Sequence, residues 1–238
     1  MAPLARLTRP IGIGVQAATA AWPQFVRPLL IELVSRRPIR EILPSVHHWT
    51  AMHDRIRQPV SSYYIESSAT LVDPMVPREG LNWFEGRDRP RQVVLTNRHH
   101  YRHSDRFVEA FGCTVHCSEH GLHEFEGGPK VEGFGFGDEV APGIVAHEVG
   151  AICPDDTALH IDAVGAIAFA DGLQRPRGGG LCFVPGFLMG DDPAAVRAGL
   201  RDAFRRLLRV DFDSLLFAHG EPLGGGGKAA LREFADRE

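Results

Sequence analysis

Residues 93–103 read Val93-Val94-Leu95-Thr96-Asn97-Arg98-His99-His100-Tyr101-Arg102-His103. A short apolar run is followed at once by three of the twelve histidines of the chain. Neutral imidazole is the commonest metal-ligand side chain, and loops held by a rigid scaffold often carry functional residues. The stretch therefore predicts a strand that delivers histidines to a metal site.

Short β-rich segments lie on both sides of this strand. Three of them precede it and predict an antiparallel meander: 46–49, 60–65 and 69–72. A strand is also predicted at residues 91–96, because the consecutive apolar residues Val93, Val94 and Leu95 are typical of a strand buried on both faces. Further strands are predicted at 114–117, within 131–148, and at 158–161, 166–169 and 214–217.

Helices are predicted at 105–111, where Ser104 is a candidate N-cap, at 193–208 and at 228–234. In 193–208, four apolar side chains share one face: Val196, Leu200, Phe204 and Leu207. The order of these elements predicts two sheets with helices packed outside them, in one domain. Residues 1–40 are expected to form a partly helical N-terminal extension, and residues 41–238 the domain itself.

The composition is that of an ordinary soluble protein, with 44% hydrophobic and 24% charged residues. The net charge of −4 argues against nucleic acid as the main partner. No apolar run reaches the roughly 18 residues that a membrane span needs, so we expect no membrane partner. Residues 11–21 weakly resemble a secretion signal, but glycines interrupt them and we prefer a cytoplasmic protein with an N-terminal extension.

The four cysteines form no Cys-x-x-Cys pair, and at this chain length they are typical of reduced thiols in a cytosolic protein. Cys113 and Cys117 lie close to His116 and His120, which leaves a zinc site as an alternative. Packing of both thiols around a strand is the preferred interpretation.

Four segments together carry a family resemblance, and they span roughly residues 45–234. They are 61–65 leading to Leu71-Val72-Asp73-Pro74, 93–96 leading into the histidine-rich loop, Ala168-Phe169-Ala170-Asp171-Gly172, and Phe212-Asp213-Ser214-Leu215-Leu216-Phe217-Ala218-His219-Gly220-Glu221-Pro222. In this order and spacing the chain resembles the metallo-β-lactamase fold superfamily. The resemblance implies an α+β protein built as a four-layer αββα sandwich.

The resemblance also implies where a metal would bind. The family loop His-x-His-x-Asp-His, placed directly after Thr96, puts its metal-binding positions on Asn97, His99, Tyr101 and Arg102. A later family histidine falls on Ile152. The ligands that remain are His99, Asp171 and His219, and His103 is a candidate replacement because it would share a helical face with His99. These residues predict one divalent ion, Zn or Fe, instead of the two that the full motif holds.

The resemblance implies a metal-dependent hydrolase that uses metal-bound water on a small-molecule ester, thioester or phosphoester. Because the loop aspartate is missing, Asp73 or His100 would have to act as the catalytic base. Asp73 ends a strand, so it is also a candidate for holding the ligand loop in place. A non-catalytic binding or scaffold protein with a vestigial pocket remains the alternative. An iron-containing redox or oxygen-binding protein is a third reading.

Overall fold

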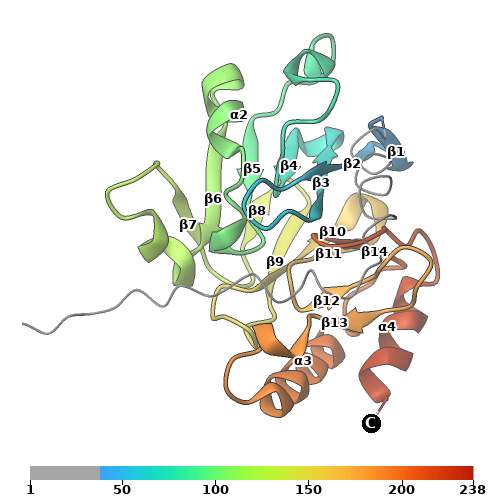
Figure 1. The fold of residues 1–238 in the computed structure, drawn as a ribbon. Helices are drawn as coiled ribbons and strands as arrows, with labels where there is room; N and C mark the ends of the chain where they lie inside the picture. Colours follow the sequence, from blue (N-terminus) through green and yellow to red (C-terminus); the bar gives the residue numbers. More distant parts are fainter. Residues whose placement is uncertain (1–37, 238) are drawn as a thin grey trace, which may run out of the picture.

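Residues 38–237 are described by a computed structural model of the chain. Two mixed β-sheets pack face to face, and helices cover their outer faces (Figure 1). This arrangement confirms the expected sandwich. Most of the partly helical extension expected over residues 1–40 lies outside the described residues, and its last residue, Arg40, belongs to a strand.

The first sheet contains seven strands that follow one another in both space and sequence. They are β1 (Arg40–Leu43), β2 (Val46–Met52), β3 (Pro59–Ile65), β4 (Thr70–Val72), β5 (Gln92–Val94), β6 (Thr114–Ser118) and β7 (Glu132–Phe134). The pairs from β1 to β4 are antiparallel, whereas those from β4 to β7 are parallel. The parallel half positions the end of β5, and therefore the histidine-rich loop, beside the ends of β4 and β6.

The second sheet has the order β14-β11-β10-β9-β8. Its strands are β8 (Glu139–Ala141), β9 (Ile144–Glu148), β10 (Thr157–Ile161), β11 (Ala166–Phe169) and β14 (Ser214–Phe217). Only β11 and β14 pair in parallel, and the helix α3 (Pro193–Leu207) lies in the crossover between them. A small hairpin, β12 (Leu173–Gln174) with β13 (Cys182–Phe183), also belongs to this crossover.

Hydrophobic contacts explain the four layers. The helix α2 (Ser104–Phe111) and the 3-10 turn η3 (Leu81–Phe84) cover the outer face of the first sheet through Phe107 and Phe84. Helices α3 and α4 (Gly227–Asp236) cover the second sheet through residues such as Phe204 and Leu231. Burying a large apolar side chain stabilises the fold by about 1.5–3 kcal/mol, and the outer layers bury several.

Half of the buried residues that the second sheet contributes to the layer between the two sheets are alanines. Ala146, Ala166 and Ala168 face inward, where they meet larger partners such as Tyr63 and Val94. The alternation of strand residues sends their neighbours to the outer face, where Ile167 and Phe169 pack under the helices. The sequence therefore specifies which face of each strand is inside.

The hydroxyl of Tyr63 joins the two sheets directly. Its oxygen donates to the carbonyl of Phe217 at 2.8 Å and accepts from the Phe217 amide at 2.9 Å. Burial raises the pKa of Tyr63 well above its usual value, so the hydroxyl keeps its proton for this contact. A backbone bond from Thr157 to the carbonyl of Thr96, 2.9 Å long, joins the sheets again where β5 ends.

Several predicted elements are confirmed with shifted ends. The helix predicted at 193–208 is α3, and its N-cap Asp192 accepts a hydrogen bond from the Ala195 amide. The helix expected from 105 begins at Ser104, so His103 takes the cap position. Residues 131–148 divide between the sheets, because β7 joins the first and β8 and β9 the second. The segment is therefore the connection between the two layers of strands.

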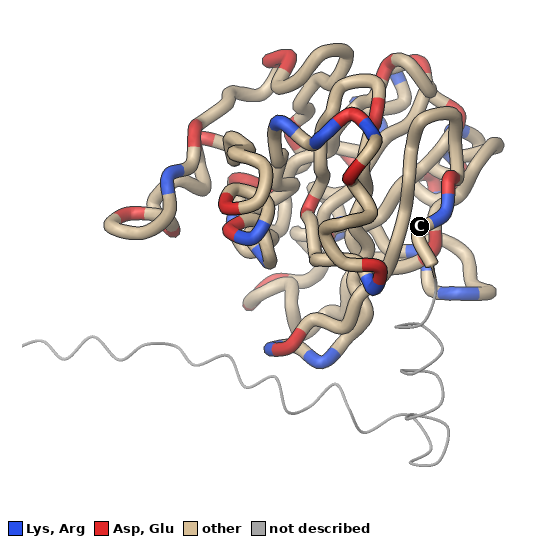
Figure 2. Tube along the Cα trace, turned by 90° about the horizontal axis from the view of Figure 1, so that it is seen from above, with Lys and Arg blue, Asp and Glu red and all other residues tan. Residues whose placement is uncertain are grey.

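The remaining bulk predictions concern charge, membrane and cysteines. Figure 2 shows acidic and basic residues interspersed along the described chain. None of the helices within residues 38–237 is long and apolar enough to cross a membrane. All four cysteines are free thiols, and burial raises the pKa of Cys113 and of Cys117 to about 12 each. In the described residues these two thiols belong to no cluster of metal-binding side chains.

Candidate metal centre

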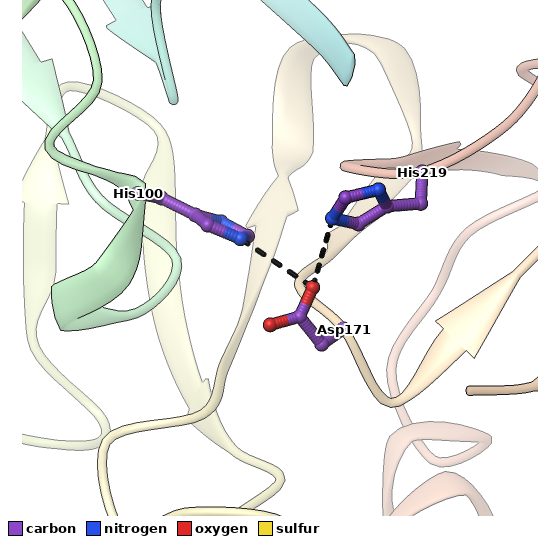
Figure 3. A group of neighbouring side chains, drawn as sticks. All are labelled: His100, Asp171 and His219. Carbon is purple, nitrogen blue, oxygen red and sulfur yellow. Dashed lines mark ion pairs between the residues drawn. The ribbon is translucent and has the colours of Figure 1, made fainter. Parts of the chain in front are cut away.

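Three side chains from distant parts of the chain meet at one end of the sandwich: His100, Asp171 and His219 (Figure 3). One donor atom of each lies within 4.8 Å of the other two. Asp171 stands between the imidazoles, since its Oδ1 lies 3.0 Å from His219 Nε2 and 3.4 Å from His100 Nε2. This is the one group of three or more potential metal-binding side chains found in residues 38–237.

Strand register explains why Asp171 and His219 lie side by side. Phe169 at the end of β11 is paired with Phe217 at the end of β14, in parallel. Asp171 and His219 each follow two residues later, so both leave the same edge of the sheet at the same height. A further bridge between Arg175 and Gly220 keeps the two segments together beyond the strands.

His100 comes from the facing sheet and is oriented by Asp73. It closes the 3-10 turn η4 (Arg98–His100), which follows β5. Its Nδ1 donates to Asp73 Oδ2 at 2.9 Å, which leaves Nε2 as the nitrogen directed at Asp171. Asp73 itself is held by Thr96, whose amide and hydroxyl donate to its two carboxylate oxygens at 2.8 and 2.5 Å. A carboxylate behind an imidazole is the usual support of a metal-binding histidine.

The charges of this group stabilise one another. Burial alone would lower the pKa of His100, but the carboxylates of Asp73 and Asp171 raise it to about 9. Burial alone would raise the pKa of Asp171, but the imidazoles of His100 and His219 hold it well below its ordinary value. The pKa of Asp73 is likewise lowered, despite burial, by His100. The opposite charges within the group therefore favour the ionised form of each of these three side chains.

No protein-family model matches the chain, and no curated protein matches it. Solved structures do: a metallo-β-lactamase from Erythrobacter litoralis is 13% identical with a TM-score of 0.59, covering 83% of this chain and 95% of its own. A B3 metallo-β-lactamase with an active-site glutamic acid is 14% identical with a TM-score of 0.61, and the match covers 90% of this chain and 92% of that protein. The protein TTHA1623 in a di-iron-bound form is 21% identical with a TM-score of 0.54, and the match covers 81% of this chain and 96% of that protein. The chain has the metallo-β-lactamase fold.

Within this fold, the histidine that completes the group is His100, and neither His99 nor His103 belongs to it. The His103 ring is engaged elsewhere, because its Nδ1 accepts the Val76 amide at 3.0 Å. His99 is exposed, and partial burial of its ring together with the Arg98 charge lowers its pKa. The helical face proposed for His99 and His103 does not form either, since η4 ends at His100 and α2 begins at Ser104.

The residues that replace the family's other ligands have structural partners. Tyr101 packs its ring against Phe125. Arg102 takes a left-handed backbone conformation, with φ of 46°, and its Nη1 donates to the carbonyls of Ser61 and Asp73 at 2.6 and 2.7 Å. Ile152 packs partly buried against the core beneath α3. None of the three side chains offers a metal ligand, as the sequence indicates.

The two candidate catalytic residues have clear positions. Asp73 is buried with 1% of its surface exposed, and its hydrogen bonds to Thr96 and His100 hold both oxygens. We therefore assign it the task of positioning His100 instead of contacting a substrate. His100 has one nitrogen on Asp73, so only its Nε2 is directed at Asp171 and His219.

The donor set fits a divalent ion. Imidazole nitrogens and a carboxylate oxygen are ligands that Zn and Fe accept, and three protein ligands with an open position are typical of catalytic zinc. Asp156 supplies an independent observation, because both its carboxylate oxygens are buried without a partner. It lies against Gly172, next to Asp171, and burial together with the Asp171 charge raises its pKa strongly. A cation in the site would favour the ionised form of this buried carboxyl group.

Proposed function

We propose that the chain is a metal-dependent hydrolase whose single divalent ion is held by His100, Asp171 and His219. The observation that carries the proposal is the orientation of His100, whose Nδ1 is held by a buried carboxylate while Nε2 is directed at Asp171. A carboxylate on one nitrogen of an imidazole is the usual support of a metal-binding histidine, because it fixes the tautomer and the ring orientation. The proposed substrates are small esters, thioesters or phosphoesters.

The residues around the proposed ion would have different roles. Asp73 holds the proton on His100 Nδ1, so Nε2 is the nitrogen that would give up its proton and bind the ion. Asp171 and His219 have exposed side-chain fractions of 28% and 16%, against 7% for His100, so a substrate would approach from their side. The ion, when bound, supplies Lewis-acid chemistry and lowers the pKa of water.

The fixed cation near the site bears on the number of ions. Arg102 is anchored on the backbone of Ser61 and Asp73, and its charge acts on both His100 and Asp73. A second divalent ion next to a guanidinium that cannot lose its proton would be repelled. We therefore propose a site for one ion.

Metal analysis of untagged protein tests the proposal. We expect about one equivalent of Zn or Fe per chain, lost on treatment with a chelator together with any hydrolysis of an ester, thioester or phosphoester panel. His219→Ala should abolish metal binding, whereas His123→Ala, an exposed histidine on η5 (Glu119–Phe125), should leave it unchanged. Protein that takes up no metal would favour the scaffold alternative, and two tightly held equivalents would refute the single-ion site.

A further inference from the structure

The side chain of Asn97 connects Asp171 to the turn that carries His100. Its Nδ2 donates to Asp171 Oδ2 at 3.0 Å, and its Oδ1 accepts the His99 amide at 2.9 Å. The amide orientation is determined by both partners at once, because a flipped group would set a donor against an N–H and an acceptor against a carboxylate. Asn97 is buried with 1% of its surface exposed, so water does not compete for these contacts.

The two contacts have different effects. As the N-cap of η4, Oδ1 holds the turn that ends in His100. Through Nδ2, the same side chain occupies one oxygen of Asp171 and leaves Oδ1 facing the two imidazoles. A carboxylate with one oxygen held by an amide therefore presents its other oxygen to an ion.

We infer that Asn97 is a positioning residue that makes Asp171 a one-oxygen ligand and thereby selects a four-coordinate ion, Zn²⁺, over ions that require more ligands. The inference rests on the proposed function and narrows its choice between Zn and Fe. Two imidazoles, one carboxylate oxygen and one open position make up the tetrahedral set of catalytic zinc. Hard ions such as Mn²⁺ favour octahedral sets rich in oxygen, which a two-oxygen Asp171 would serve better.

Two substitutions separate the contacts. Asn97→Ser keeps a good N-cap oxygen but is too short to reach Asp171, whereas Asn97→Ala loses both contacts. Both variants and the wild type are prepared without metal and then titrated with Co²⁺, Zn²⁺ and Mn²⁺. The visible spectrum of Co²⁺ reports the coordination number, and thermal unfolding of the metal-free proteins reports the cap.

We expect the wild type to give the intense visible bands of four-coordinate Co²⁺. Asn97→Ser should give the weaker bands of five-coordinate Co²⁺, bind Zn²⁺ about 10- to 100-fold more weakly, and lose part of its preference for Zn²⁺ over Mn²⁺. Its metal-free stability should stay close to that of the wild type, while Asn97→Ala should also be less stable. The control Asp105→Asn, at an exposed position on α2, should leave the Co²⁺ spectrum and the preference for Zn²⁺ over Mn²⁺ unchanged.

The outcomes distinguish this inference from the proposed function. If the wild type binds none of the three ions, the proposed metal site itself is refuted. If the wild type binds Zn²⁺ but Asn97→Ser gives the same Co²⁺ spectrum and the same preference, the metal site stands and the role of Asn97 is overturned. Equal loss of metal by Asn97→Ser and Asn97→Ala, in proportion to lost stability, would show a purely structural residue and would also overturn it.

Discussion

At the scale of single residues, the sequence indicates a histidine in the site but not which one. A family spacing counted from Thr96 selects His99, whereas the structure brings His100 to Asp171. Counting assumes an extended loop, but the residues after Asn97 coil into a 3-10 turn that rotates the next side chains. The signal that could have identified His100 is its relation to Thr96 and Asp73, which hold its Nδ1.

This difference is testable with neighbouring substitutions. We expect His100→Ala to abolish binding of the ion, because it removes one of three protein ligands, and to leave Asp73 buried without its imidazole partner. His99→Ala should keep metal stoichiometry and reduce affinity less than about threefold, since its ring belongs to no ligand group in the described residues. Isothermal titration of both metal-free variants with Zn²⁺ measures the contrast. If His99→Ala loses binding and His100→Ala does not, the ligand is His99, as the family spacing predicts.

At the scale of elements, the strands that carry Asp171 and His219 were predictable. Both residues follow short apolar runs, and the ends of neighbouring strands meet at one edge of a sheet. The parallel pairing of β11 with β14 brings this about. The pairing itself could not be read from the sequence, because the two strands are separated by β12, β13 and α3. The pattern of apolar residues specifies each strand but not its partner.

Gly220 is the tightest point of this edge, directly after His219. Its φ is +120°, and a Cβ there would lie 2.2 Å from the carbonyl oxygen of Arg175. We expect Gly220→Ala to lower the free energy of unfolding by about 2 kcal/mol or more, from the strained conformation and the clash together. Gly224→Ala is the control, since a Cβ there meets only Leu43 at 3.8 Å and should change stability by less than about 0.5 kcal/mol. Urea unfolding of the two variants should show the difference, and equal stabilities would contradict it.

At the scale of the whole molecule, the two-sheet arrangement followed from the order of strands and helices. The division of residues 131–148 between the two sheets could not be predicted, because the composition of a short strand does not indicate which sheet it joins. The side-chain network across the sheets was also not predictable. It connects Asp73, Thr96 and His100 of the first sheet's loops to Asp171 after β11, and each link depends on distances that only the folded chain sets.

The hydroxyl of Tyr63 has a further consequence for how copies of the chain behave in solution. Strand β14 is the last strand of its sheet, so its outer backbone groups could recruit a strand from another molecule. Leu215 exchanges backbone bonds with Leu223, and Tyr63 occupies both the amide and the carbonyl of Phe217. The outer edge of β14, which is buried, is thereby blocked against intermolecular pairing.

Tyr63→Phe should therefore aggregate more readily than a variant that is destabilised to the same extent elsewhere in the fold. The substitution keeps the ring but leaves the amide and carbonyl of Phe217 without the hydroxyl, at a cost of about 1–3 kcal/mol for an unsatisfied buried group. Light scattering during mild heating should rise earlier in Tyr63→Phe than in Gly220→Ala at equal stability. If both variants aggregate in parallel with their loss of stability, Tyr63 acts only within the fold. If Tyr63→Phe aggregates before Gly220→Ala on heating, the hydroxyl of Tyr63 protects β14 against pairing between molecules.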